Sequence, residues 1–279
     1  MKRLLFLLLL IPVLSFGQEV YTYGGDVVTY SGDVVTKSYP NVLVDGNTVA
    51  WYIADDLTTI TKDGSDFVSR WNDYLGSGRD LLQAAVGAHP LWSADGILFD
   101  GTTDFMKAVA FTYEQPEMIY IVFKQVTWTS VDYFFDGNAS NSGIVYQAGV
   151  TPQIVAYAGS ASTNNGNLAL DTWGIVRVLF DGAASKLIVN ETAATTGNFG
   201  VNDMGGFTLG TKGAGSSGNT ANIQVKEIIL RKISDSAGDE ADIYAYLKAK
   251  YELAINPLTT LLLLLLLAFK RNRKNLKSL

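Results

Sequence analysis

Short apolar runs separated by Gly, Asn and Asp fill the chain from Val49 to Lys232. Val, Ile, Phe and Tyr favour strands, and the Gly or Asn residues between the runs favour tight turns. No helical pattern interrupts the runs, so they indicate a sandwich of antiparallel strands. The predicted strands are Val49–Ile53, Phe105–Phe111, Met118–Val126, Val131–Phe135, Gly143–Gln147, Gln153–Tyr157, Trp173–Phe180, Lys186–Asn190, Phe207–Gly210 and Ile223–Lys232. Between the first two, Asp55–Arg70 is predicted to be a loop with a polar tip.

One amphipathic helix is predicted after the last strand. Ser236 can cap its first turn, and Asp239 stands three residues later, at the capping-box position. Ile243, Leu247 and Tyr251 recur at four-residue spacing and share one face. The pattern therefore predicts an all-β, antiparallel two-sheet fold that ends in one C-terminal helix.

The stretch Gly96–Met106 holds two apolar runs around an Asp-Gly step. Asp and Gly tolerate the positive φ angles of hairpin turns, so two strands joined by a tight reversal are the first interpretation. Asp100 and Asp104, with two threonine hydroxyls between them, also suit a hard cation or a sugar hydroxyl. Phe-Asp-Gly recurs at residues 135 and 180, each time after an apolar run. The repetition favours turns, and Asp100 is predicted to be a hairpin residue.

The N-terminus has the pattern of a secretory signal peptide. Two basic residues precede the apolar run Leu4–Val13, and small residues at 15 and 17 predict cleavage after Gly17, which makes 1–17 the signal. Residues 18–47 are predicted to be an extended spacer, because a Tyr-x-Gly-Asp-Val-Val-Thr segment occurs twice in succession, from residue 23 and from residue 30. A calcium-binding repeat is the alternative for this segment.

Residues 254–279 predict a hydrophobic segment followed by a basic tail. Leu258–Phe269 is almost wholly apolar, and five Lys and Arg residues follow it. A helix of this run is about 18 Å long, against about 30 Å for the membrane core. The basic residues fit the positive-inside rule, and the arrangement is similar to C-terminal sorting signals read by a membrane transpeptidase. We expect an exported protein held at the cell surface by a membrane anchor or a cleaved sorting signal; a buried terminal helix is the alternative.

Charge separates the body of the chain from its ends. Of 21 Lys and Arg residues, two lie in the signal and five in the tail, whereas all 27 Asp and Glu residues lie between them, which leaves a net charge of −13 on that part. Nucleic acid needs clustered positive charge, so this partner is excluded. A neutral glycan, a cation or a basic protein surface remains. The absence of Cys excludes disulfides and a lipoprotein anchor.

A set of ordered motifs resembles laminin-G-like jelly-roll domains of the concanavalin A-like lectin/glucanase superfamily. The motifs are Ala50-Trp51-Tyr52, Val68–Asp73, Gly78–Leu81, Phe99–Asp104, Ile228–Leu230 and Tyr246–Tyr251. Tyr74-Leu75 departs from the Ser-Gly type of turn expected there. The resemblance covers about Val49–Leu253, so residues 48–253 are predicted to be one domain. It implies a jelly roll of two packed antiparallel sheets whose rim loops bind glycans, sometimes with calcium.

The sequence offers no complete catalytic set. His89 is the single histidine, it precedes Pro90 in an apparent loop, and there is no Cys. Glucanase relatives of this fold carry acidic residues that alternate along one strand, because nucleophile and acid must lie about 5 to 5.5 Å apart. None of the seven Glu residues forms such a cluster. We expect a protein that is not an enzyme, with a glycoside hydrolase of the same fold as an alternative.

Aromatic planes that stack on sugar faces are candidates for a glycan site. The aromatic candidates are Trp128, Tyr133, Tyr146, Tyr157 and Trp173, of which Trp128, Tyr133, Tyr157 and Trp173 are the predicted ligand-binding residues. Calcium, the candidate cofactor, needs several loop oxygens. The predicted metal ligands are Asp100, Asp104, Asp136 and Asn138.

The expected function is that of an exported cell-surface binding or adhesion module whose partner is a glycan or surface polysaccharide. The tail adds the membrane as a second contact, and proteins are further candidate partners. A structural or protein-interaction component of a surface assembly is the alternative from another class.

Overall fold

The computed structural model describes residues 27–30, 33–36, 39–162, 166–215 and 218–252. The chain divides into two units, residues 1–41 and 42–279. In the first unit, β1 (Val27–Tyr30) and β2 (Asp33–Thr36) pair as a two-stranded antiparallel sheet. These strands coincide with the two copies of the Val-Val-Thr repeat, whose β-branched residues favour extended backbone.

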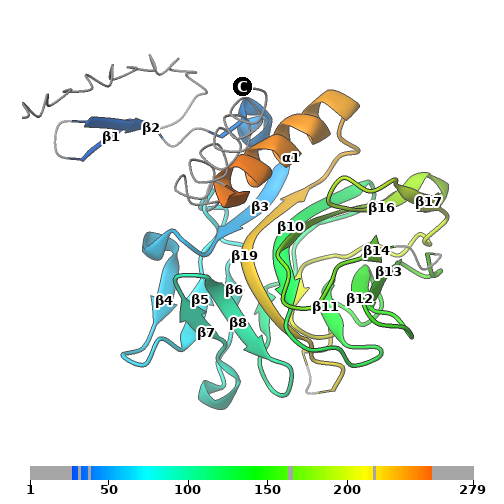
Figure 1. Ribbon diagram of the computed structural model, residues 1–279, viewed down its shortest axis with the longest axis horizontal. Coiled ribbons are helices and arrows are strands. Elements are labelled where there is room, and N and C mark those ends of the chain that lie inside the picture. Colours follow the sequence, from blue (N-terminus) through cyan, green and yellow to red (C-terminus); the bar gives the residue numbers. More distant parts are fainter. Residues whose placement is uncertain (1–26, 31–32, 37–38, 163–165, 216–217, 253–279) are drawn as a thin grey trace, which may run out of the picture. The chain divides into compact units, whose positions relative to one another are not determined.

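The second unit is built from two larger antiparallel sheets (Figure 1). In the first sheet the strand order is β17-β16-β15-β10-β19-β8-β7, and β3 also pairs with β19. Its strands are β3 (Thr48–Ile53), β7 (Leu91–Ser93), β8 (Gly96–Asp100), β10 (Glu117–Gln125), β15 (Gly174–Phe180), β16 (Ser185–Val189), β17 (Thr195–Gly197) and β19 (Asn222–Arg231). The long strand β19 pairs with β8 over its first half and with β3 over its second half, so it forms the spine of this sheet.

The second sheet has the order β14-β13-β12-β11-β18-β9-β6-β5-β4. Its strands are β4 (Ile60–Lys62), β5 (Val68–Trp71), β6 (Leu81–Leu82), β9 (Met106–Ala108), β11 (Tyr133–Asp136), β12 (Ile144–Gln147), β13 (Gln153–Tyr157), β14 (Gly166–Asn167) and β18 (Thr208–Leu209). Four short 3-10 helices lie in the connections: η1 (Asn41–Val44), η2 (Leu57–Thr59), η3 (Val86–Ala88) and η4 (Gly182–Ala184).

The core lies between the two sheets. Ile119, Ile121 and Phe123 alternate along β10 and belong to the core cluster, so the residues between them lie on the outer face of the first sheet. Phe123 meets Phe134 of β11 with ring centroids 4.8 Å apart, which joins the two sheets directly. Truncating such a buried Phe to Ala costs about 3 to 5 kcal/mol.

The α1 helix (Ala237–Glu252) covers the outer face of the first sheet, the face turned away from the core (Figure 1). Ser236 caps it as predicted, because the Asp239 N–H donates to the Ser236 hydroxyl at 3.2 Å. Ile243 and Leu247 are buried. Tyr251 donates to Glu227 of β19 at 2.6 Å, so polar as well as apolar contacts attach the helix to the sheet.

The predicted fold class is confirmed: two antiparallel sheets are followed by the single α-helix among the described residues. Every predicted strand overlaps an observed one. The predicted loop Asp55–Arg70 is partly wrong, since it contains η2, β4 and the first residues of β5. These elements are too short for a period of two to be recognised in the sequence.

The predicted hairpin at Gly96–Met106 is wrong. β8 pairs with β7 and β19 in the first sheet, whereas β9 pairs with β6 and β18 in the second. The Asp-Gly step therefore marks the place where the chain crosses from one sheet to the other, and Gly101 supplies the positive φ of +72° that the bend needs. A hairpin does occur just before it, where Ser93 pairs with Gly96.

The two ends of the chain carry predictions that rest on the sequence. The predicted signal peptide, residues 1–17, and the predicted apolar and basic tail, residues 254–279, lie outside the described residues. Both assignments stay predictions. No helix in the described part of the chain combines the length and the apolar character needed to cross a membrane.

Candidate functional site

Three tyrosines from neighbouring strands lie on the outer face of the second sheet. Tyr133 of β11 pairs directly with Tyr146 of β12, and Tyr157 of β13 pairs with Ile144 of β12. Directly paired residues share a face, as do residues two apart on one strand, so all three rings lie on the same side. The ring centroids of Tyr133 and Tyr146 are 5.7 Å apart. We call Tyr133, Tyr146 and Tyr157 the tyrosine face.

The tyrosine face is partly covered and partly open. Ile144 and Val155 lie on the same side of the sheet as the tyrosines and are only 3% exposed. Such low exposure is expected where neighbouring aromatic rings cover aliphatic side chains. Tyr133 is 9% exposed, whereas Tyr146 and Tyr157 are half-buried and keep ring surface accessible to a ligand. The site therefore offers two accessible rings on a rigid sheet.

The hydroxyls of Tyr133 and Tyr146 stay protonated over the physiological pH range. Burial raises the pKa of Tyr133, and the nearby Asp136 carboxylate acts in the same direction. Burial likewise raises the pKa of Tyr146, with Tyr157 adding to the effect. Neutral phenols both donate and accept hydrogen bonds, which is the pairing that sugar hydroxyls need.

Two asparagines border the tyrosine face. The Tyr133 hydroxyl donates to Asn141 Oδ1 at 3.1 Å, and Asn202 Nδ2 donates to the Asn141 carbonyl at 3.1 Å. Both asparagines are exposed. A side chain at Gly159 would meet the Asn202 amide at 3.2 Å, so the glycine lets that amide lie close to the β13 end of the face. Neither asparagine is predicted from the sequence, because 61 residues separate them.

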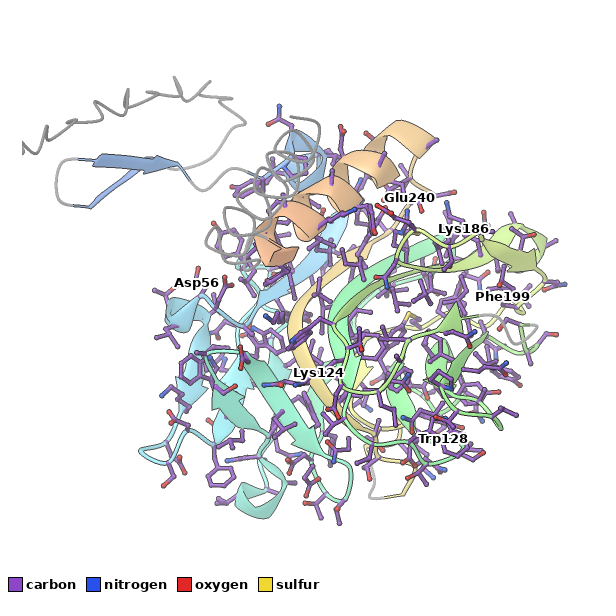
Figure 2. All side chains as sticks on the ribbon, viewed as in Figure 1. Asp56, Lys124, Trp128, Lys186, Phe199 and Glu240 are labelled. Carbon is purple, nitrogen blue, oxygen red and sulfur yellow. The ribbon has the colours of Figure 1, made fainter. Side chains whose placement is uncertain are left out.

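Trp128 is half-buried in the loop between β10 and β11, which leads to Tyr133 (Figure 2). Gln147 fixes this loop on both sides of the indole: its Oε1 accepts the Thr129 N–H at 2.8 Å, and its Nε2 donates to the Thr127 carbonyl at 2.7 Å. Among the described residues, the buried indole Nε1 has no hydrogen-bond partner. The turn context predicted for Trp128 is present, but the residue is held in the structure rather than fully exposed.

Trp173 lies on the other sheet, just before β15, where it lines a cavity with α1 residues. The four predicted ligand-binding residues are therefore not one constellation. The structure brings Tyr133 and Tyr157 together around Tyr146, and it places Trp173 on the outer face of the opposite sheet.

The predicted metal ligand Asp136 is buried and organises the β11–β12 loop. Burial raises the pKa of Asp136, and backbone N–H groups act against that shift. Its two oxygens accept the backbone N–H groups of Gly137, Asn141, Ser142, Gly143 and Gly213. Beside it, Lys107 Nζ donates to the carbonyls of Asn138 and Gly213. The structure thus places an ammonium group against this loop, where a cation was predicted.

Asp100 and Asp104 cap each other's backbone at the crossing between the sheets. Asp104 Oδ2 accepts the Asp100 N–H at 3.1 Å, and Asp100 Oδ1 accepts the N–H groups of Thr102, Thr103 and Asp104 at 2.7 to 3.0 Å. Burial and the neighbouring Asp100 charge raise the pKa of Asp104 to about 6. Partial burial acts to raise the pKa of Asp100, but the backbone hydrogen bonds that its carboxylate accepts outweigh this effect, so the pKa of Asp100 is lowered. Two adjacent carboxyls thus differ in protonation near pH 5 to 6.

Other titratable groups are buried away from these sites. His89 is buried, and its Nε2 lies 2.8 Å from the Gln83 carbonyl, so it is held within a loop. Glu117 is fully buried, and burial raises its pKa to about 9. Among the described residues, no group of three or more His, Cys, Asp or Glu side chains is placed to hold a metal ion. Calcium stays a prediction.

Comparison with known proteins supports the fold. No protein-family model and no curated protein matches the sequence. Among solved structures, Trypanosoma rangeli sialidase in complex with 2,3-difluorosialic acid matches with a TM-score of 0.52 and 12% identity over 74% of this chain and 33% of that one. A mutant GH54 α-l-arabinofuranosidase soaked with 4-nitrophenyl α-l-arabinofuranoside matches with a TM-score of 0.51 and 14% identity, over 64% of this chain and 50% of that one. The chain spans a third to a half of these proteins.

These matches correct one sequence prediction. We expected a protein that is not an enzyme, but the two structures described above, which share this fold, are enzymes: a sialidase and an arabinofuranosidase. Identities of 12% and 14% establish the fold and leave the activity of this chain to be argued from its own residues.

Proposed function

We propose that this protein recognises carbohydrate through the tyrosine face. The observation that carries the proposal is the set of three tyrosines on adjacent strands, bordered by the amides of Asn141 and Asn202. Sugar rings have apolar faces that stack on aromatic planes, and hydroxyls that pair with phenols and amides. The proposal includes the laminin-G-like, concanavalin A-like assignment, which the two antiparallel sheets support.

Binding to a glycan array, with and without calcium, tests this function. Y146A is expected to lose binding about tenfold, since one stacked ring contributes roughly 0.5 to 1.5 kcal/mol beyond its buried area. Y146F, which keeps the ring, is expected to retain most of the affinity. F67A removes an exposed aromatic outside the face and serves as the matched control. Absence of array signal, or equal losses in Y146A and F67A, contradicts the proposal.

Glycoside hydrolysis is the second candidate, and the Asp100–Asp104 pair favours it. Glycosidases pair one protonated carboxyl with one ionised carboxylate, and pairs whose environments separate their pKa values mark such assignments. In this role Asp104, whose pKa is raised to about 6, is the general acid, and Asp100 is the carboxylate. Asp100 is exposed and Asp104 is buried beneath it at 8% exposure, so in this role a substrate reaches the pair from the side of Asp100.

Release of reducing sugar from a panel of polysaccharides tests the second candidate. D104N is expected to lower the rate at least a hundredfold, because general acid catalysis contributes about that much. D95N removes an exposed Asp on the turn between β7 and β8 and should leave the rate unchanged. If the wild-type chain releases no sugar from any polysaccharide, the hydrolase assignment is withdrawn, while glycan binding is judged on the array.

The location of the protein is a further part of the proposal. The acidic body with an apolar and basic C-terminus supports an exported protein retained at the cell surface. Deleting residues 258–279 is expected to release the protein into the medium. If the truncated protein stays with the cells, the tail is not what retains it.

A further inference from the structure

A second concave site lies on the opposite sheet from the tyrosine face. It is a cavity of about 230 Å³ between the C-terminal half of α1 and the outer face of the first sheet. Its lining residues are Val122, Trp173, Gly174, Ile175, Asn190, Glu191, Tyr244, Leu247, Lys248 and Tyr251. Pockets for drug-sized ligands measure about 300 to 1,000 Å³, so this cavity suits a smaller group such as one sugar ring.

Two ammonium groups lie close to the indole of Trp173, the residue through which they adjoin the cavity, although neither lysine is one of its lining residues. Lys226 Nζ lies 4.4 Å and Lys124 Nζ lies 5.4 Å from the centroid of Trp173, and Lys226 Nζ is also 5.4 Å from the ring of Tyr251. The two lysines come from adjacent strands. Lys124 is on β10 (Figure 2), and Lys226 is on β19, at the point where β19 passes from β8 to β3. The sheet therefore holds both charges at the same aromatic residue.

Neither ammonium group has an anionic partner in contact. Within the described ranges, neither Lys124 nor Lys226 donates a hydrogen bond or forms a salt bridge; their close partners are aromatic rings. Burial lowers the pKa of Lys226, Lys124 adds to that effect by repulsion, and the more distant Asp95 and Asp55 oppose it. Two like charges near one indole repel each other when no anion is bound.

The neighbouring lysines show the usual arrangement. Lys248 pairs with Glu191, and Lys250 pairs with both Glu227 and Asp55. Carboxylates are abundant in a segment of net charge −13, yet in the described part of the chain the contact of Lys124 is with an aromatic ring and not with a carboxylate. An external anion would supply the missing partner and would relieve the repulsion.

We propose that a charged sugar binds at the Trp173 cavity, with its ring against the aromatic lining and its carboxylate or sulfate beside Lys124 and Lys226 where they adjoin Trp173. The ammonium groups supply charge-assisted hydrogen bonds, and Tyr251 and Tyr244 supply apolar surface. The Asn190 side-chain oxygen already accepts the Ile175 N–H at 2.8 Å, which leaves its amide nitrogen to donate to a sugar hydroxyl. This site is independent of the tyrosine face.

Calorimetric titration of the full chain with defined oligosaccharides tests the proposal. Oligogalacturonate carries carboxylates, dextran sulfate carries sulfates, and unmodified dextran is the neutral control. We expect one or both acidic ligands to bind in a salt-sensitive manner and dextran to bind at least tenfold more weakly at this site. The K124Q/K226Q double variant should lose at least tenfold in affinity for the acidic ligands, and which of them binds identifies the group recognised.

Two controls separate a specific site from general charge. K232Q removes an exposed Lys from the same acidic domain and should leave the affinity unchanged. Y146A should also leave it unchanged, so failure of the tyrosine-face proposal is distinguishable from failure of this one. Thermal unfolding of each variant reports whether it is folded. The proposal is overturned if no acidic ligand binds, if dextran binds equally well, or if K232Q loses as much affinity as the folded double variant.

Discussion

Glu117 is a buried carboxyl with only one satisfied oxygen. Its Oε1 accepts the Met204 N–H at 2.6 Å, whereas its buried Oε2 has no partner among the described residues. Burial is the main cause that raises its pKa from 4.5 to about 9, with smaller contributions from Asp203 and Glu114. The native state therefore keeps this group protonated at neutral pH, while the unfolded chain releases the proton.

The sign of the pH dependence follows from that difference. Because the folded pKa lies above the unfolded one, the stabilising contribution of Glu117 is fully present below about pH 4.5 and is lost as the pH rises towards 9. Between pH 6.5 and 8.5 the free energy of unfolding should fall by about 2 to 3 kcal/mol, and E117Q should remove most of this fall. Urea unfolding at pH 6.5 and at pH 8.5 measures this fall. If the free energy of unfolding falls equally in the wild type and in E117Q, the assignment to Glu117 is contradicted.

Asp136 and Asp181 occupy the same place in two copies of Phe-Asp-Gly, but they differ in function. Asp136 accepts five backbone N–H groups, four of them in buried hydrogen bonds, whereas no hydrogen bond of the Asp181 carboxylate caps η4. D136A should lower the free energy of unfolding by about 3 kcal/mol or more, because it leaves buried donors unpaired. D181A should leave the midpoint of urea unfolding almost unchanged. Similar effects of the two variants would show that the loop does not depend on this carboxylate.

At the scale of elements, Glu227 attaches α1 to the first sheet. It is fully buried on β19, and Trp51 and Tyr246 donate to its Oε1 at 2.8 and 3.1 Å, while Lys250 and Tyr251 donate to its Oε2 at 2.7 and 2.6 Å. Three of these four donors, Tyr246, Lys250 and Tyr251, belong to α1. One carboxylate thus connects β3, β19 and the helix.

Neutralising Glu227 should therefore loosen the helix before the sandwich unfolds. E227Q places an amide NH2 group against hydroxyl and ammonium donors, and the expected loss is about 2 to 4 kcal/mol. Hydrogen exchange should accelerate in α1 more than in β10. E191Q, which removes an exposed partner of Lys248, is the control and should change neither measurement. Uniform acceleration across both elements would mean that Glu227 stabilises the fold without a special part in holding α1.

The sequence determines strands better than it determines their partners. Alternation and Gly or Asn breaks located β10, β13 and β15 closely, since these strands each bury one face in the core. The Asp-Gly step at Gly101 correctly marked a bend, yet β8 and β9 entered different sheets because turn chemistry is local and sheet membership depends on distant strands.

The same limit applies to the candidate sites. Aromatic type alone selected Tyr133 and Trp173 as equivalent candidates, whereas pairing places them on opposite sheets. Tyr146 joins Tyr133 through direct register, and Lys124 meets Trp173 only because β10 and β15 are neighbours. These contacts depend on which strands are neighbours in the sheet, so a local sequence pattern does not predict them.

At the scale of the whole domain, the two candidate sites lie on outer faces with the core between them. Packed sheets are about 10 Å apart, and the core layer is rigid and close-packed. No residue of the tyrosine face lines the Trp173 cavity. The sites should therefore bind at the same time, which would let one molecule connect a neutral and an acidic glycan segment.

Simultaneous binding predicts additivity. A neutral oligosaccharide found on the array should not displace oligogalacturonate or dextran sulfate, and the effects of Y146A and K124Q/K226Q on the two affinities should add to within about 0.5 kcal/mol in a double-mutant cycle. Competition titrations of the single and combined variants measure this.

Direct competition would mean that both ligands use one surface, whereas coupling well above 0.5 kcal/mol without competition would mean that the core transmits a change between the sheets. Independence is the expected result because the residues that fix each site, Gln147 and Asn141 on one side and Glu227 on the other, share no hydrogen bond in the described part of the chain.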